Sequence, residues 1–159
     1  MQPLFSMFDV PCFYRGELVA SPRPPLPLKV LWLDTEQSQQ STQEILKERI
    51  IPLAKVDSIN DTFYTFNLRG LGFERRGKMV DVVIRAIRPD ICFIDGIKDL
   101  MTDINDAVQA TLIMEKLMAL AKELNCCIVC VLHQNKSEQD RNMRGSIGTK
   151  LTTKVQKYF

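Results

Sequence analysis

The stretch Ile91-Cys92-Phe93-Ile94-Asp95-Gly96-Ile97-Lys98-Asp99-Leu100 decides the fold of this chain. Its first four residues are apolar without alternation and follow Pro89-Asp90, which is typical of a strand buried on both faces of a sheet. The run ends in Asp95, followed by a glycine. In open α/β sheets, ligands bind just past the carboxyl ends of parallel strands. The stretch therefore predicts an α/β fold in which Asp95 faces a ligand or a metal ion.

Segments with the patterns of strands and helices alternate along the rest of the chain. The order β-α-β-α-β-α-β predicts a parallel sheet with right-handed crossovers and helices on both faces, in three layers. The expected strands cover residues 28–34, 62–68, 91–95 and 126–132. The first expected helix starts at Ser38 or Ser41 and runs to about residue 54, and the third covers 105–124. The second carries an apolar stripe at residues 80–87 and stops at Pro89. Residues 1–27 end in a proline-rich connector, so we expect them to form an N-terminal segment ahead of a core at 28–159.

Composition indicates a soluble protein. The 159 residues suit one domain, and 45% hydrophobic with 25% charged residues is ordinary for a globular chain. No apolar run is long enough to cross a membrane, and the first residues lack the pattern of a signal peptide. The cysteine count of five is odd. Free thiols in a reducing compartment explain it best, which predicts a cytoplasmic location without membrane contact.

Positive charge is concentrated at the C-terminal end. Residues 133–159 carry six lysines and arginines against only two acidic side chains. Such a segment favours a polyanionic partner, bound through its phosphates and weakened steeply by salt. A solvated tail explains the charge equally well.

Polar side chains follow three of the expected strands. Glu36 follows the first strand, Asp95 ends the third, and His133-Gln134-Asn135 follows the fourth. Because the carboxyl ends of parallel strands lie at one edge of a sheet, these groups can converge. A carboxylate for hydrated Mg²⁺, a second to orient water, and an amide or imidazole to sense phosphate would suit nucleotide hydrolysis.

Three segments carry a resemblance to a known family. They are Val30–Ser38, Ile91–Gly96, and Val131–Ser137 followed by Met143-Arg144-Gly145-Ser146. In order and spacing they resemble the RecA-like ATPases, most of all the branch of plasmid replicative helicases and related replication or mobilisation proteins. The resemblance covers roughly residues 28–159.

The resemblance implies a role for each matched residue. Glu36 would activate water, and Asp95, at the Walker B position, would hold Mg²⁺. His133 and Gln134 would couple the γ-phosphate to the DNA-facing loop, and Arg144 would act on DNA or on a neighbouring subunit's nucleotide. It further implies ATP and Mg²⁺ as cofactors, a hexameric homo-oligomer, and single-stranded DNA as partner, contacted by Lys136, Arg141 and Arg144.

One motif of that family is missing. Such an ATPase needs G-x-x-x-x-G-K-[ST] ahead of the Asp34 strand, because backbone N–H groups and the lysine cradle the phosphates. Residues 1–27 contain only Gly16. The string from Gly72 to Lys78 has the spacing, but Met79 replaces the magnesium-binding hydroxyl. We expect a helix start there; a different phosphate binder that uses this string is a weaker alternative.

The missing loop has consequences for the fold and the function. The family places the phosphate-loop strand between the strands at 91–95 and 126–132. Either these two strands pair directly, or residues 1–20 or another molecule fill the gap. A truncated reading frame, incomplete at both ends and weak in ATP binding, is the simplest expectation. The alternative function is a non-catalytic nucleic-acid-binding or oligomerisation module that kept the RecA-like fold.

Other features predict packing rather than chemistry. Cys127 and Cys130 have the spacing of a redox or zinc pair, but residues three apart in a strand point to opposite faces. We expect both to be buried. Lys98 is expected to be a solvated charge. Leu112 and Met118 lie off the apolar stripe of the last helix, which predicts that this helix is covered on two sides.

Overall fold

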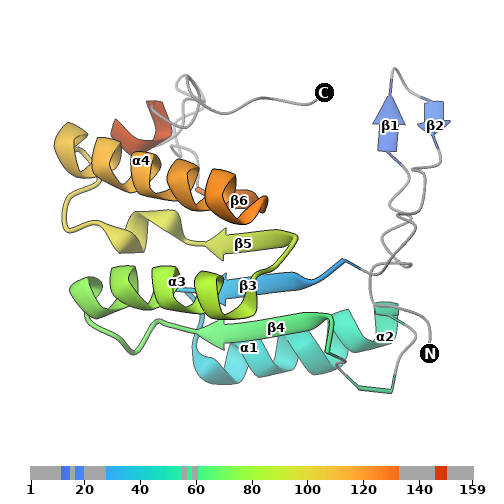
Figure 1. Ribbon diagram of the computed structural model, residues 1–159. Helices are drawn as coiled ribbons and strands as arrows, with labels where there is room; N and C mark the ends of the chain where they lie inside the picture. Colours follow the sequence, from blue (N-terminus) through green and yellow to red (C-terminus); the bar gives the residue numbers. More distant parts are fainter. Residues whose placement is uncertain are drawn as a thin grey trace.

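A four-stranded parallel sheet forms the centre of the computed structural model (Figure 1). The structure describes the backbone of residues 12–14 and 17–19, and residues 28–54, 57–58, 61–132 and 146–149. The first two segments, β1 (Cys12–Tyr14) and β2 (Glu17–Val19), form a separate antiparallel pair that the sequence patterns did not predict. The α/β fold class is confirmed.

The sheet has the strand order β4-β3-β5-β6. Its strands are β3 (Val30–Asp34), β4 (Phe63–Asn67), β5 (Ile91–Asp95) and β6 (Cys127–Val131). All neighbouring strands are parallel. The four predicted strands are therefore confirmed, and their carboxyl ends share one edge.

The first long helical segment is capped by Ser38. The Ser38 side chain accepts a hydrogen bond from the backbone of Ser41, which satisfies one of the free N–H groups of the first turn. Helix α1 (Gln39–Ile45) continues through the π-helical turn η2 (Leu46–Ile50) into α2 (Ile51–Ala54). The predicted helix over 38–54 is confirmed, with Ser38 as its cap.

The other two helices also lie where the apolar spacing predicts them. Helix α3 (Phe73–Ile87) ends at Arg88, which adopts a left-handed conformation just before Pro89. Helix α4 (Ala107–Leu124) begins at Asp106. The Asp106 side chain accepts from the backbone of Gln109 and Val108, and these bonds, the one from Gln109 foremost, lower the pKa of its carboxyl. A short 3-10 helix, η3 (Ile97–Leu100), follows β5.

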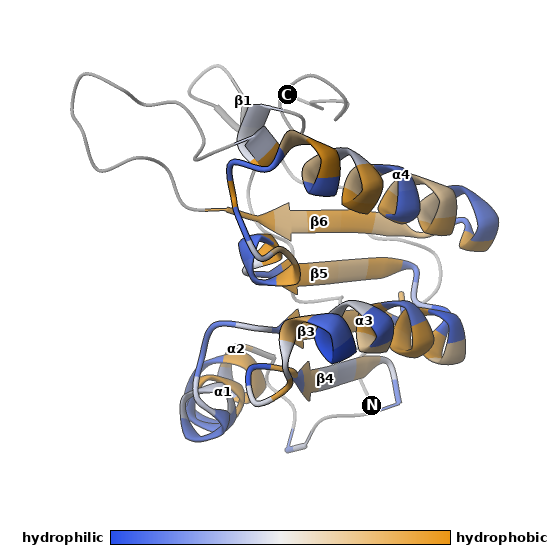
Figure 2. Cartoon of the chain, turned by 90° about the vertical axis from the view of Figure 1, so that its left-hand side faces the viewer, coloured by the Kyte–Doolittle hydropathy of each residue, from blue (hydrophilic) through white to orange (hydrophobic). Residues whose placement is uncertain are grey.

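Helices cover both faces of the sheet, as predicted (Figure 2). On one face, α3 and α4 pack on the inward side chains of β3 and β5, with Ile84, Leu120, Leu33 and Ile94 fully buried. On the other face, the η2 turn packs on Val30 and Phe63. The result is three layers, because each apolar face of a sheet must be covered by another element.

The β6 end of the sheet differs from the expectation in two ways. Strand β6 pairs directly with β5, one of the arrangements that the sequence left open. Its side chains are also less buried than predicted: Cys127 is exposed, and Val129 and Val131 are 36% and 38% exposed to solvent. The apolar cluster beneath η2 contains side chains of β3, β4 and β5 but none of β6.

Helix α4 is covered on one side only. Leu112 and Met118 are 60% and 48% exposed, so the prediction of a second covered side is wrong. Only the stripe that includes Ala110, Met114 and Leu117 is buried.

No helix in the described part of the chain is both long enough and apolar enough to cross a membrane.

Candidate functional site

The strand register brings polar residues into one row at the carboxyl edge of the sheet. Asp34, the last residue of β3, lies between Asn67 of β4 and Asp95 of β5. Val131 of β6 is the next residue in the row. Residues paired across parallel strands point to the same face. The row therefore presents two carboxylates and an amide at one edge.

Asp34 is fully buried and shapes the loop that carries Glu36. Its Oδ1 accepts hydrogen bonds from the backbone N–H groups of Glu36 (3.1 Å) and Gln37 (2.9 Å). Its Oδ2 accepts from the Thr42 hydroxyl at 2.5 Å, and Asn67 donates to that hydroxyl at 2.8 Å. Asp34 is thus a positioning residue, whereas the sequence pattern predicts it only as the end of a strand.

Thr35 joins this loop to the turn that follows β5. Its backbone N–H donates to the carbonyl oxygen of Asp95 at 3.0 Å. Its hydroxyl lies 2.7 Å from that same oxygen, 2.8 Å from the Gly96 carbonyl and 3.1 Å from Asp99 Oδ2. Hydrogen bonds from Thr35 therefore join the loop that carries Glu36 to the end of the strand that carries Asp95.

Gly96 allows these two loops to touch. Its φ angle is 91°, in the left-handed region that favours glycine. A Cβ atom at this position would lie 2.3 Å from Glu36 Cγ and 2.4 Å from Thr35 Oγ1. The structure thus brings Glu36 against the turn that begins at Asp95, as the sequence predicted for these two residues.

Lys98 is not a solvated charge, and that prediction is wrong. Its Nζ atom forms an ion pair with Glu36 Oε1 at 2.9 Å, and the two side chains are 36% and 16% exposed. The cause is the 3-10 turn of η3, in which Ile97 and Leu100 are buried and Lys98 is directed toward the loop after β3. The sequence holds no sign of this turn.

Arg76 connects the site to the start of α3. Its guanidinium donates to the carbonyl oxygen of Asp99 in η3 at 2.6 Å. It also donates to three carbonyl oxygens of the loop between β4 and α3, those of Leu68, Arg69 and Leu71. One side chain thereby satisfies acceptors in both segments beside the Glu36 loop.

These groups surround a polar cavity of about 450 Å³. Every described residue that lines it carries a hydroxyl group or a charge: Thr35, Glu36, Arg69, Arg76, Lys98 and Asp99. The arrangement can hold an anion beside the cations, or a polarised water beside the carboxylates.

The donors near Asp95 suit one kind of metal site only. Among the described residues there is no group of three or more His, Cys, Asp or Glu side chains that could hold a metal ion. An all-protein cage is therefore not present in that part of the chain. Mg²⁺ keeps most of its waters and takes one or two carboxylates together with substrate phosphates. Asp95 fits that hydrated type of site.

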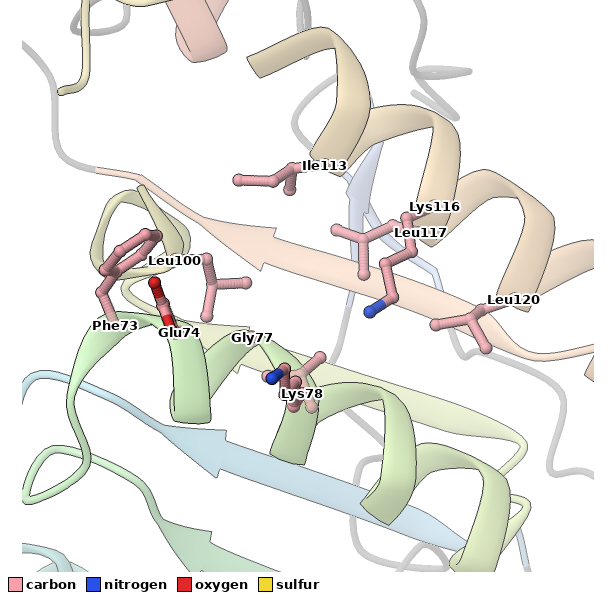
Figure 3. Close-up of a pocket in the computed structure, with 10 residues that line it drawn as sticks. Phe73, Glu74, Gly77, Lys78, Leu100, Ile113, Lys116, Leu117 and Leu120 are labelled. Carbon is pink, nitrogen blue, oxygen red and sulfur yellow. The ribbon is translucent and has the colours of Figure 1, made fainter. Parts of the chain in front are cut away.

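The string from Gly72 to Lys78 forms a helix start and not a phosphate loop. Gly72 is the N-cap of α3, and the residues from Phe73 onward are helical. Figure 3 shows Phe73 and Lys78 beside a groove between α3 and α4. That groove, of about 370 Å³, is lined largely by apolar side chains and includes neither Glu36 nor Asp95. The alternative of a phosphate binder that uses this string is therefore wrong.

Three of the described cysteines are buried or partly buried and poorly suited to chemistry. Burial raises the pKa of the Cys92 thiol, that of Cys126 to about 11 and that of Cys130 to about 12. The thiolate is the nucleophile and the metal ligand, so a raised pKa makes these thiols poorly reactive at neutral pH. Only Cys127, among the described cysteines, is exposed.

The remaining predicted site residues, His133, Gln134, Lys136, Arg141 and Arg144, lie outside the described residues. Comparisons of the chain with models of protein families and with curated proteins found no match.

Proposed function

We propose that this chain is part of a RecA-like ATPase core that acts in the replication, unwinding or mobilisation of DNA from a plasmid or other mobile element. One observation carries the proposal. The loop with Glu36 and the strand end with Asp95 meet at the carboxyl edge of a parallel sheet, joined through Thr35 and Gly96. This is the edge at which open α/β sheets bind nucleotides.

In this proposal Asp95 would hold Mg²⁺ through its hydration shell, and the ion would neutralise charge on the phosphates of ATP. Glu36 would orient and deprotonate the attacking water. Asp34 would keep Glu36 in place through the two backbone hydrogen bonds that shape its loop. His133 and Gln134 would sense the γ-phosphate, and Arg144 would act on DNA or on a neighbouring subunit.

The test is Mg-ATP turnover by the chain, measured with and without single-stranded DNA. Turnover is expected to be low, because the sequence has no phosphate loop of the required pattern. Glu36→Gln should reduce it by a further factor of about 100 without weakening ATP binding. Asp95→Asn should weaken the dependence on Mg²⁺. Glu44→Gln, on the exposed side of α1, is the matched control. Turnover that neither substitution at the site changes would refute the proposal.

A second candidate, a nucleic-acid-binding module without catalysis, also has support. Glu36 is engaged in an ion pair with Lys98, and the string nearest to a phosphate loop is helical. In this case DNA should bind without ATP, with an affinity that falls steeply as salt rises. Lys136→Ala and Arg144→Ala should each reduce that affinity. Absence of DNA binding at low salt would eliminate this candidate.

A further inference from the structure

Among the described residues that line the polar cavity beside Glu36, positive charges outnumber negative ones. Arg69, Arg76 and Lys98 line it, against the carboxylates of Glu36 and Asp99. Like-charged side chains gather around a small volume at a cost in free energy, which an anion between them offsets. The question is which of these charges are available to a ligand.

Two of the five charged groups are committed to the fold. Asp99 Oδ2 lies 3.1 Å from the hydroxyl of Thr35. The Arg76 guanidinium donates to main-chain carbonyl oxygens, which carry no net charge. Within the described part of the chain, neither Arg76 nor Arg69 forms an ion pair with a carboxylate. Arg76 therefore contributes positive potential without being free to move.

The carboxylate of Glu36 already occupies the position of an anion in this cavity. Its loop is fixed by Asp34, and its Cγ fills the space left by the missing side chain of Gly96. From there Glu36 Oε1 reaches Lys98 Nζ at 2.9 Å. A carboxylate and a phosphate group present similar oxygens to an ammonium, but the phosphate group can carry a second negative charge.

We propose that this cavity binds a phosphate group, with Lys98 and Arg69 as its donors, and that Glu36 occupies the position until the ligand arrives. Binding breaks the pair between Glu36 and Lys98, so the Glu36 carboxylate is released from Lys98 only when a phosphate is present. The proposal concerns binding, and it holds whether or not the chain hydrolyses ATP. A nucleotide or the backbone of a nucleic acid can supply such a group.

The test is calorimetric titration of the full chain with inorganic pyrophosphate. The wild type should show saturable binding. Lys98→Ala should weaken it by about tenfold, and Arg69→Ala should weaken it by a smaller factor. Glu36→Gln should instead strengthen it by about three- to tenfold, because the competing carboxylate becomes a neutral amide. This gain in pyrophosphate affinity on Glu36→Gln is specific to the proposal. If the ion pair had only a structural role, its loss would weaken binding.

Two variants on the exposed side of α4 make the same changes of charge elsewhere. Lys122→Ala and Glu115→Gln should change the affinity by less than about twofold, because both charges are exposed, neither lines the cavity, and salt screens exposed charges. The proposal is overturned if these controls change the affinity as much as the cavity variants do. It is equally overturned if the wild type shows no saturation at millimolar pyrophosphate, or if Glu36→Gln weakens binding.

Competition then identifies the source of the phosphate. ATP and an oligothymidylate are each added to the chain in the presence of pyrophosphate. Displacement by ATP that Lys98→Ala weakens supports a nucleotide phosphate, and displacement by the oligothymidylate supports a nucleic-acid backbone. Failure of both to displace bound pyrophosphate would overturn the assignment to either source.

Discussion

At Gly96 the backbone has a φ angle of 91°, and the space for a side chain is already filled by Glu36 and Thr35. Gly96→Ala must therefore strain the backbone and separate the two loops of the site. We expect the free energy of unfolding to fall by about 2–4 kcal/mol. Urea denaturation followed by circular dichroism measures this loss.

Gly77 provides the matched control, since it lies within α3 and nothing is found within 4 Å of an added Cβ. Gly77→Ala should raise the free energy of unfolding by up to about 1 kcal/mol, because alanine is the better helix former. A loss at Gly77 equal to that at Gly96 would show that the effect is not due to the contact with Glu36.

Arg76 is the second residue whose role can be tested alone. Arg76→Met keeps the length of the apolar stem and removes the donors to carbonyl oxygens of Leu68, Leu71 and Asp99, among others. Because these acceptors are only partly reachable by water, we expect a loss of about 1–3 kcal/mol in the free energy of unfolding. Hydrogen exchange should also become faster at the Leu71 amide, which donates a hydrogen bond to the carbonyl oxygen of Leu68.

Arg75→Met is the comparison for that change. Arg75 is exposed at the preceding position of α3, so this substitution should lower the free energy of unfolding by no more than about 0.5 kcal/mol. Equal losses at the two positions would mean that the carbonyl contacts of Arg76 contribute nothing measurable.

At the scale of elements, local sequence signals predict where most helices and strands lie. They do not predict which strands are covered by helices. Ser38 caps its helix, Pro89 follows the end of α3, and the apolar runs locate the strands within about two residues. Strand β6 has the same continuous apolar composition as β5, yet Cys127 and Val129 are exposed. The apolar composition of a strand shows that it could be buried. Whether a helix packs against it depends on segments that are distant in the sequence.

The thiols in and next to β6 provide a test of how far this strand is exposed. Cys127 is exposed, whereas burial raises the pKa of Cys126 to about 11 and of Cys130 to about 12. Native alkylation with iodoacetamide at pH 8, mapped by tandem mass spectrometry, should therefore modify Cys127 before Cys126 and Cys130. The rates at Cys126 and Cys130 should rise as pH approaches these pKa values, because the thiolate is the reacting form.

Faster modification of Cys130 than of Cys127 at pH 8 would contradict the placement of β6. Denatured protein is the control, since all thiols should then react at similar rates.

At the scale of the whole molecule, the sequence predicts that Glu36 and Asp95 lie close together. It does not predict the hydrogen bonds and the ion pair that fix their positions. Glu36 and Asp95 lie together because parallel strands end at one edge, a rule that needs only the order of the elements. The contacts that fix them depend on details without a sequence signature. Lys98 faces Glu36 because of a 3-10 turn, and Thr42 reaches Asp34 because Ser38 caps α1. Pairing of β5 with β6 was left open for the same reason: strand order is decided by the whole sheet.

The open end of the sheet yields the last prediction. Strand β6 contains no charged residue, proline or glycine, and it is an end strand of the sheet in the described part of the chain. Such edges pair with other strands unless a charge prevents it. We therefore expect association that increases with concentration, and Val129→Lys should reduce it. The folded chain should lose no more than about 1 kcal/mol of stability, because Val129 is already 36% exposed.

Sedimentation velocity over a range of concentrations measures this association. Val82→Lys introduces the same charge on the exposed side of α3, where Val82 is 54% exposed. If both variants reduce association equally, net charge is responsible and β6 is not the contact. If only Val129→Lys does so, the edge of β6 is the surface through which copies of this chain meet. A wild-type chain that stays monomeric at all concentrations would show that this edge does not pair between copies.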